Sequence, residues 1–283
     1  MTGSRELAQR LGFAFLTLVT VVVVLPIVLV VGYIVVQGAP ALSWEFITQM
    51  PRGGMREGGL LPAIVGTLWL TVGTAVFAVP LGVAMAIYLA EYASDNLFTR
   101  VVRLSIVNLS GIPSVVYGLF GLGMLVLFLG LGSSILAGAL TLAIMTLPVI
   151  ISTSEEALRA VPQSFRTVSI SLGGTKWQTI SRIVLPQALP GILTGVILGL
   201  ERAAGETAPI LFTVAAFYLP RLPQGAFDQA MALPYHLYVI STQVPNVDEK
   251  VRYGTALVLL MMVLTMNLVA IIIRYQFRKK KKW

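Results

Sequence analysis

The sequence predicts an all-α membrane protein with six transmembrane helices and both termini in the cytoplasm. Hydrophobic residues make up 57% of the 283 residues and charged residues only 11%, whereas ordinary soluble chains carry roughly 25% charged residues. The mean hydropathy is +0.87. Six stretches are long and apolar enough to cross a bilayer, which takes ~20 residues at a rise of 1.5 Å each. Because so few charges cannot cover a water-exposed surface, the predicted solvent is lipid.

The six predicted spans follow one another along the chain, some with polar interruptions: 11–36, 61–90, 104–131, 134–151, 191–216 and 254–273. The first follows Arg5 and Arg10 and resembles a secretory signal, but it is too long for one and no small-residue cleavage site follows it cleanly. We therefore expect it to remain as a span. A proline lies inside each of the first four spans: Pro26, Pro80, Pro113 and Pro148. These prolines predict kinked, closely packed helices, with or without a direct role in function.

The orientation follows from the basic residues in the loops. With the N-terminus inside, 14 of the 20 Lys and Arg residues lie in inner segments, five lie in outer segments, and Arg202 lies within the fifth span. This asymmetry places both termini in the cytoplasm. The predicted organisation is an N-terminal tail, first helix and outer loop (1–60), a five-helix transmembrane domain (61–275) with an inner loop at 152–190, and a basic cytoplasmic tail (276–283).

The charge and the motifs exclude several classes of function. The net charge of +8 arises from loops and from the basic tail, so it predicts attraction to anionic lipid and no nucleic-acid partner. The chain has no Cys and one His, so we expect no metal site, and His236 is expected at an outer membrane interface. Gly173-Gly174-Thr175-Lys176 has the wrong order and spacing for a phosphate-binding P-loop. If the process uses ATP, another polypeptide must hydrolyse it.

Three charges in the fifth predicted span are the strongest functional signal. Arg202 would lie about 16 Å along a helix that starts near residue 191, close to the bilayer midplane. An ionised group there costs at least ~2.5–3.5 kcal/mol, so Glu201, Arg202 and Glu206 must face protein or water. Arg202 and Glu206 share a helix face at i, i+4 and can pair, whereas Glu201 needs its own partner. The group either fixes helix packing as an ion pair or borders an anion path, for which the planar fork of Arg is suited.

The inner loop is the second signal. Ser154 followed by two acids resembles the capped start of a helix, and Gly173-Gly174 predicts a break before a second short helix at 176–185 that ends before Pro186. Two short amphipathic helices in a basic loop could lie on the membrane or dock a soluble partner.

At this loop the chain resembles the permease subunits of binding-protein-dependent ABC importers. Their hallmark is E-A-A, three residues, G, nine residues and I-x-L-P. Gly173 and Ile183-Val184-Leu185-Pro186 match the second half, but Thr167-Val168-Ser169 stands in place of E-A-A. That departure puts in doubt any contact that the family's Glu makes.

Within this superfamily the whole chain is similar to the PstA-type subunits of phosphate importers. Four stretches carry the similarity: R-A-A-G-E-T-A-P at 202–209, L-P-A-I-V-G-T at 61–67, G-I-P-S-V-V-Y-G at 111–118, and A-L-P at 232–234 with Tyr238. The sister PstC-type subunits share the G-I-P-S and R-A-x-G-E-T stretches but usually depart at the position of Ala208-Pro209.

The resemblance implies the type I ABC importer permease fold and a multi-pass place in a bacterial or archaeal plasma membrane. It implies a periplasmic phosphate-binding protein (PstS-type) on the outer loops, a homologous PstC-type permease as the other half of the path, and two cytoplasmic ATPases (PstB-type). ATP and Mg²⁺ would be used by the ATPases, and no cofactor would be bound by this chain. The coupling residues would be Gly173, Gly174, Thr175, Lys176 and Trp177, and the phosphate path would include Arg202 and Glu206.

Three other functions compete with phosphate import. A permease for sulfate or molybdate could use the same Arg202 guanidinium, but the match to the phosphate permeases at 202–209 argues against it. A transporter or channel driven by an ion gradient would suit six spans and buried acids, yet has little reason to keep a 39-residue inner loop. A membrane scaffold would not justify three charges within a span.

Overall fold

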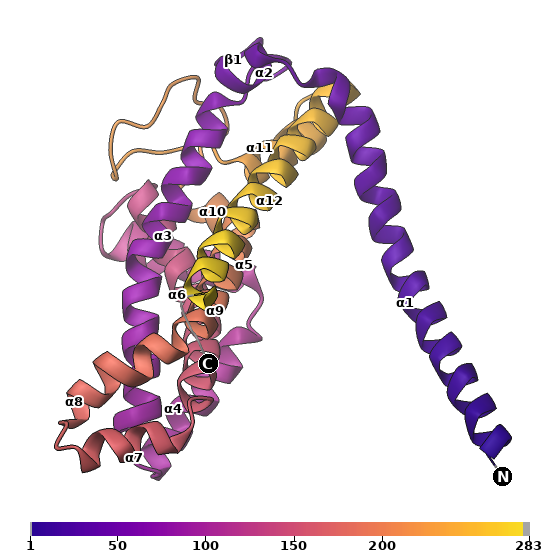
Figure 1. The fold of residues 1–283 in the computed structure, drawn as a ribbon. Coiled ribbons are helices and arrows are strands. Elements are labelled where there is room, and N and C mark those ends of the chain that lie inside the picture. Colours follow the sequence, from indigo (N-terminus) through magenta and orange to yellow (C-terminus); the bar gives the residue numbers. More distant parts are fainter. Residues whose placement is uncertain (1, 280–283) are drawn as a thin grey trace.

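The structure, a computed structural model, describes residues 2–279 and is helical almost throughout (Figure 1). The helices of the first half are α1 (Thr2–Gly38), the 3₁₀ turn η1 (Ala39–Ala41), α2 (Trp44–Thr48), α3 (Leu61–Ile87), the π-turn η2 (Tyr88–Tyr92), α4 (Leu97–Ser110), α5 (Ser114–Gly121) and the π-turn η3 (Leu122–Phe128). Those of the second half are α6 (Ile135–Arg159), α7 (Gln163–Ser171), α8 (Lys176–Thr179), the π-turn η4 (Ile180–Val184), α9 (Leu185–Gly205), α10 (Ala208–Thr213), α11 (Leu233–Thr242) and α12 (Glu249–Lys279). A hairpin of β1 (Pro51–Arg52) and β2 (Glu57–Gly58) lies between α2 and α3.

The predicted all-α membrane architecture is confirmed. Five segments are long and apolar enough to cross a membrane: Gln9–Ala41, Leu61–Tyr92, Ile135–Arg159, Lys176–Gly205 and Glu249–Gln276. A sixth span exists only if the bent pair Leu97–Ser110 and Ser114–Phe128 is counted as one. The predicted boundary at residue 276 falls inside α12, and of the predicted basic tail residues 280–283 lie outside the described residues.

The bundle is centred on α6, which packs against α3 and α9. Small residues bring these helices close together: Gly82 of α3 and Gly199 of α9 lie against Ile150 of α6, and Gly195 lies against Thr153. Close approach of this kind supplies van der Waals contact, which is what holds helices together where lipid removes the hydrophobic drive. Ile150 is fully buried as a result.

The third span, predicted at 104–131 with a kink at Pro113, is broken into two helices that begin earlier, at Leu97. The direction of the chain changes by 103° between α4 and α5. The break lies at Gly111-Ile112-Pro113, where proline has no N–H to donate to the preceding turn. The hydroxyl of Tyr117 donates to the Leu109 carbonyl at 2.7 Å and so satisfies one of the carbonyls left at the end of α4. The segment therefore lies partly along the bundle and partly across it.

The predicted inner loop at 152–190 has the predicted break at Gly173-Gly174 and the helix that begins at Lys176, but more of it is helical than predicted. Ser154 caps no helix, because α6 continues through it to Arg159 and buries its side chain. Pro186 does not end a helix either, since Lys176 to Gly205 forms one span. The π-turn η4 stands immediately before this proline, and the Leu185 N–H bonds to Ile180 O, five residues back. A wider turn at this point accommodates a residue that can neither donate nor fit the normal i, i−4 spacing.

Helix α1 stands apart from the bundle (Figure 1) and contacts it near the C-terminal end of α1. There, the rings of Tyr33 and Tyr253 meet edge to face with centroids 5.4 Å apart, and Gly38 lies against the Tyr253 backbone. No residue in the most apolar 18-residue stretch of this span is buried. A surface of this kind requires lipid or another protein around it.

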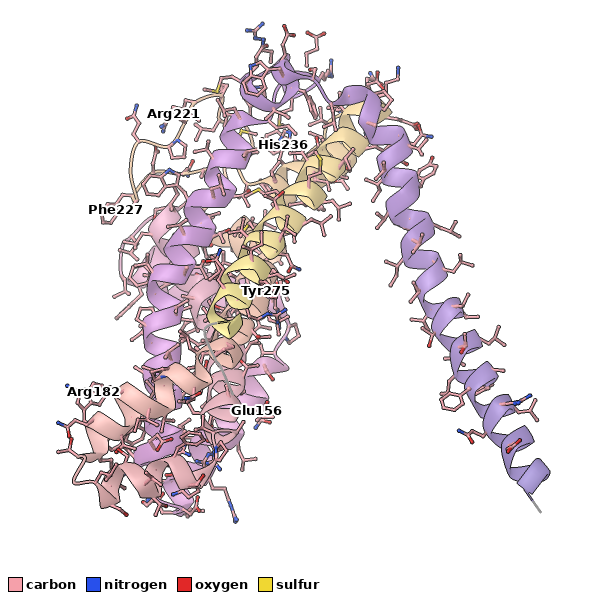
Figure 2. The ribbon with its side chains drawn as sticks, viewed as in Figure 1. Glu156, Arg182, Arg221, Phe227, His236 and Tyr275 are labelled. Atoms are coloured by element: carbon pink, nitrogen blue, oxygen red, sulfur yellow. The ribbon has the colours of Figure 1, made fainter. Side chains whose placement is uncertain are left out.

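The N-terminal end of α1, the C-terminal end of α12 and the α7–α8 region all point toward the same end of the molecule (Figure 1). The outer hairpin and the loop before α11 lie at the other end. Figure 2 shows Arg221 and Phe227 on that loop and Arg182 near the opposite end. Which end faces the cytoplasm stays a prediction from the positive charges of the loops.

Cysteine labelling tests the orientation directly, because the natural chain has no Cys. In intact cells, a membrane-impermeant thiol reagent should modify the Gly225→Cys variant and leave the Ser164→Cys variant unmodified. Opening the cells should expose the second site. The reverse pattern would overturn the assignment of both termini to the cytoplasm.

Candidate functional site

Arg202 and Glu206 form the predicted ion pair, with Arg202 Nε 3.4 Å from Glu206 Oε1. Their setting differs from the prediction, because α9 ends at Gly205 and Glu206 has an extended backbone. Arg202 therefore lies in the last turn, about 39 Å from the start of the span at Lys176 and not 16 Å along a helix beginning near residue 191. A cation is favoured at the C-terminal end of a helix, where the unpaired carbonyls carry partial negative charge.

The Glu206 side chain is only 15% exposed and that of Arg202 is 39% exposed. Glu206 lines a small cavity, together with residues from α3, α6, α9, α10 and the start of α11. These are Thr67, Leu70, Thr71, Leu142, Ala203, Ala204, Ile210, Ala232 and Pro234. The carboxylate thus faces the interior of the bundle while the guanidinium reaches outward from it.

The sequence stretches that carry the family resemblance meet around this cavity. The Thr67 hydroxyl accepts a hydrogen bond from the Leu233 N–H at 2.9 Å, which joins the start of α3 to the start of α11. Gly118 of α5 lies so close to α10 that a Cβ there would be 3.0 Å from both Ala208 O and Pro209 Cα. At Gly118, segments 90 residues apart in sequence are therefore packed so closely that a larger residue would have to displace one of them.

Gly66 offers a test of this packing. A Cβ at Gly66 would overlap with the carbonyl oxygen of Met231. We expect Gly66→Ala to lower the free energy of unfolding by roughly 1–3 kcal/mol or more, because the backbone of one helix must move away. The change would be measured as a lower Tm of the purified protein in detergent. Gly32→Ala, in open space on α1, is the matched control, and equal Tm values for the two variants would contradict the close packing.

Tyr117 was not singled out from the sequence, yet it lies close enough to Arg202 for the guanidinium to act on it electrostatically. Its ring is 6% exposed, and its hydroxyl is held by the carbonyl of Leu109. The hydroxyl of this tyrosine is thus held at the bend between α4 and α5. A tyrosine within G-I-P-S-V-V-Y-G was the signal that could have pointed to it.

Glu201 stays apart from this pair. Its Oε1 is buried and has no hydrogen-bond partner within residues 2–279. Thr194, seven residues earlier on the same face of α9, accepts a hydrogen bond at 3.2 Å from Arg274 of α12. Helical periodicity thus turns Glu201 toward α12. Arg274, counted from the sequence among the basic residues of the inner side, takes part in the contact between α9 and α12.

The five residues predicted to couple to an ATPase form one compact turn. Gly173 has a φ of +85°, a conformation that favours glycine, and the Gly174 N–H donates to Ser169 O at 3.0 Å. Thr175 and Gln178 form a reciprocal capping box at the start of α8. Lys176 begins that helix, with its Nζ 4.6 Å from the centre of the Tyr92 ring. The turn is thereby fixed from both sides.

We use the term coupling element for residues 163–184, which comprise α7, this turn, α8 and η4. Its surface carries apolar side chains that nothing in the described chain covers. Leu172 is 83% exposed and Trp177 is 62% exposed. Ser169, which stands where the family motif has the second Ala of E-A-A, is buried and shares a hydrogen bond of 2.8 Å with the Thr179 hydroxyl. A hollow of about 500 Å³ lies between α7 and α8 beside these residues.

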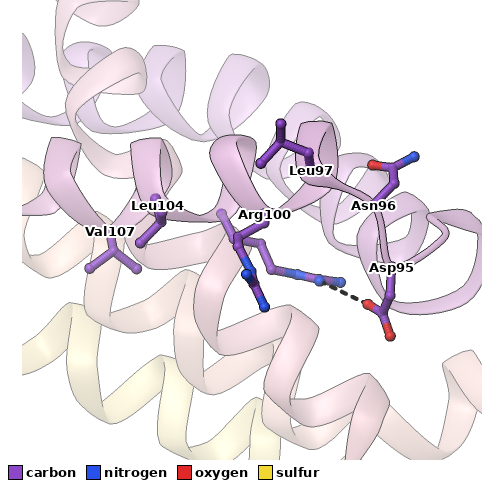
Figure 3. Close-up of a pocket in the computed structure, with 7 residues that line it drawn as sticks. Asp95, Asn96, Leu97, Arg100, Leu104 and Val107 are labelled. Carbon is purple, nitrogen blue, oxygen red and sulfur yellow. Dashed lines mark ion pairs between the residues drawn. The ribbon is translucent and has the colours of Figure 1, made fainter.

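A second hollow, of about 650 Å³, lies at the start of α4 (Figure 3). Arg100 and Arg103 line it with Asp95, and Arg103 pairs with Asp95 at 3.6 Å. None of the predicted site residues line this hollow. Its two arginines agree with the excess of basic residues predicted for the inner side.

His236 was expected at a membrane interface, but it is 3% exposed within α11. Burial lowers its pKa to about 4, so the ring is neutral at physiological pH. Nearby, the Arg221 guanidinium holds the pKa of the Asp228 carboxyl well below its usual range. This pair closes the outer loop on itself, and the contact is lost only as the pH falls far enough to protonate Asp228.

The helical bundle and its solved neighbours define the fold of an ABC importer permease. A chain of a bacterial alginate ABC transporter, solved with its alginate-bound periplasmic protein, has a TM-score of 0.65 at 16% identity over 95% of this chain and 97% of its own. A chain of the inward-facing MetNI methionine ABC transporter has a TM-score of 0.63 at 18% identity over 77% of this chain and 95% of its own.

The family model for the binding-protein-dependent transport system inner membrane component matches residues 78–283, and the chain belongs to this family. It is 35% identical over its full length to the phosphate transport system permease protein PstA 1 of Mycobacterium tuberculosis, covering 92% of that protein. It is 34% identical to the probable ABC transporter permease protein YqgI of Bacillus subtilis, over 94% of this chain and 95% of that one.

Membership makes the chain a multi-pass protein of the plasma membrane and a permease subunit, which is not itself an ATPase. Members of this family work with an ATPase and a substrate-binding protein. The predicted fold class and class of protein are therefore confirmed.

Proposed function

We propose that the chain is the membrane-spanning permease subunit of an ATP-driven importer of inorganic phosphate. In this function it forms the translocation path with a homologous PstC-type permease, and a PstS-type phosphate-binding protein docks on its outer loops. Two PstB-type ATPases bind on the inner side. Relatives named as phosphate permeases at about one-third identity support this substrate.

One observation carries the proposal, the incomplete bonding of the Arg202 guanidinium. Its Nε faces Glu206, but within residues 2–279 no hydrogen bond or ion pair occupies either terminal nitrogen. A planar guanidinium presents donors in a fixed fork that matches two oxygens of phosphate. Arg202, 39% exposed beside Glu206, is therefore the residue we place against the passing anion.

Glu206 has a complementary role. Its carboxylate holds the guanidinium in place between transport events and competes with phosphate for it. Transport requires an anion to bind well enough to enter and weakly enough to leave, and a built-in competing acid provides that balance. Glu201, on the face toward α12, is placed farther along the same path, where its buried oxygen lacks a partner.

The coupling element supplies the link to ATP. We assign the exposed Leu172 and Trp177, on either side of the fixed turn, to a cleft of the ATPase. The Gly173–Trp177 turn leads without a helix break into α9, which ends at the Arg202 site. Movement of the ATPases would therefore reach the anion site through a single helix.

The experiment that tests the substrate uses the complete complex in proteoliposomes. Phosphate with its binding protein should stimulate ATP hydrolysis and drive uptake of radiolabelled phosphate, and excess sulfate or molybdate should not compete. Stimulation by sulfate or molybdate but not by phosphate would transfer the assignment to another oxyanion. Uptake that persists without ATP would favour a carrier driven by an ion gradient.

A further inference from the structure

A buried ion pair joins the coupling element to the inner end of α3, between residues 75 positions apart in sequence. Arg166 Nη2 of α7 lies 2.6 Å from Glu91 Oε1, and the side chains are 12% and 7% exposed. Arg166 Nε is 3.2 Å from both carboxylate oxygens. Such a bidentate, desolvated pair fixes geometry far more strictly than a surface ion pair does.

Arg166 also binds the end of α6. Its Nη1 donates to Val161 O at 2.7 Å and its Nη2 to Leu158 O at 2.9 Å. These carbonyls belong to the last turn of α6 and the linker that follows it, where intrahelical donors run out. One guanidinium therefore connects three elements: α3 through Glu91, the end of α6, and α7, which carries it.

Glu91 is presented by a specialised piece of backbone. It lies in the π-turn η2, which is closed by a bond from Ala93 N–H to Tyr88 O at 2.8 Å. The next residue, Tyr92, lies under the Lys176 ammonium of α8 at 4.6 Å. Both arms of the coupling element thus contact adjacent residues of η2, the turn that continues α3 within the span Leu61–Tyr92. Between them lies a polar hollow of about 550 Å³ lined by Glu91, Arg166 and Lys176 among others, so these side chains bridge two bodies that are not packed solidly together.

The other end of α3 lines the Glu206 cavity. Leu61 to Tyr92 forms one span, and Thr67, Leu70 and Thr71 face the cavity. Thr71 and Glu91 are about 30 Å apart along the helix. A displacement imposed on Glu91 would be carried along this helix to the wall of the cavity, because a packed helix moves largely as a unit.

We propose that the Arg166–Glu91 pair is the joint that transmits movement of the coupling element to α3 and thereby opens or closes the Glu206 cavity. Arg166 and Glu91 are positioning residues: they touch neither the anion nor ATP. The inference rests on the proposed function, in which the coupling element follows the ATPase. It adds a second route to the cavity, independent of the direct helical connection through α9.

Charge reversal and a reporter thiol test the joint in the full complex. Thr71→Cys places a thiol at the cavity in a chain that has no other Cys, and its modification by a small reagent is read by mass spectrometry with and without ATP. In this background, Arg166→Glu and Glu91→Arg should each keep the ATPase bound and hydrolysing ATP. Phosphate uptake should fall at least tenfold, and the ATP-dependent change in thiol reactivity should disappear.

Combining Arg166→Glu with Glu91→Arg restores an ion pair and should bring both readouts back to within about threefold of the starting protein. A merely structural pair would lower assembly, not uncouple an assembled complex. Arg159→Glu is the matched control, because Arg159 pairs with Glu155 at 3.0 Å on the neighbouring turn but is 53% exposed; it should leave coupling unchanged.

The joint is overturned if the single variants assemble and keep the ATP-dependent reactivity, or if the double variant assembles without regaining it. Where a reversal prevents assembly, Arg166→Lys and Glu91→Gln replace it. Lys keeps the charge but cannot bond Glu91 and two carbonyls at once, and Gln at position 91 removes the negative charge. Each of these two variants should therefore weaken coupling. Full coupling in both variants would overturn the proposal. A wild-type complex that moves no phosphate would refute the proposed function alone, since the thiol readout uses only ATP.

Discussion

Arg202→Gln should abolish phosphate uptake while the subunit still assembles with its partner permease and ATPases. Glutamine keeps a similar length but loses the charge and the fork of parallel donors. Two charge-assisted hydrogen bonds are worth about 1.5–3 kcal/mol each, and each 1.36 kcal/mol corresponds to a factor of ten in rate. A loss of ~100-fold or more is therefore expected in initial uptake rates measured with radiolabelled phosphate.

The control for this experiment is Arg10→Gln, which removes the same charge from α1, outside the bundle, and should retain uptake. Glu206→Gln separates the roles of the pair: it removes the competing anion but leaves the guanidinium, so phosphate should bind more tightly and leave more slowly. Normal uptake by an assembled Arg202→Gln complex would remove Arg202 from the path.

Leu172→Asp should release the ATPase from the membrane complex. This side chain projects from the turn of the coupling element at 83% exposure, so the substitution does not disturb the interior of the permease. Losing one buried Leu from an interface costs about 1.5–3 kcal/mol, and the new carboxylate must also lose its water on docking. Co-purification of the ATPase with the tagged permease, read as stoichiometry on a gel, measures the effect.

Phe227→Asp is the matched control, because Phe227 is 70% exposed but lies on the loop at the opposite end of the molecule (Figure 2). It should leave the ATPase attached. Gly174→Glu provides a second probe of the same turn, since its Cβ would lie 2.9 Å from Ser169 O and force the turn open. Stoichiometric ATPase on both coupling-element variants would exclude this surface as the docking site.

Hydropathy and charge predicted the all-α fold and most spans, because exposure to lipid dictates composition over whole helices. The boundaries failed where local backbone chemistry mattered. In the sequence, Pro186 predicts the end of a helix. The π-turn of five residues before it lets the helix continue although proline has no N–H to donate, and the hydrophobic periodicity of the sequence does not reveal such a turn. Pro113 predicted a kink in the third span, but a proline alone does not show how far the chain turns, which is 103° here.

The site was predictable in part. Arg202 and Glu206 were found because ionised groups in a span are costly and because four positions along a helix bring side chains together. Their real setting at the end of α9 was missed along with the helix boundary. Contacts between distant segments, such as Arg166 with Glu91 or Thr67 with Leu233, leave no mark in a single sequence, because only the packing of helices determines which side chains meet.

The isolation of α1 has an evolutionary consequence. None of its residues belongs to any of the five hydrophobic clusters found in the described chain, and the family match begins only at residue 78. The buried clusters of the bundle are thus assembled without the first helix. Apolar substitutions along most of this helix can therefore accumulate without disturbing those clusters, and an engineer could graft a different membrane anchor in its place.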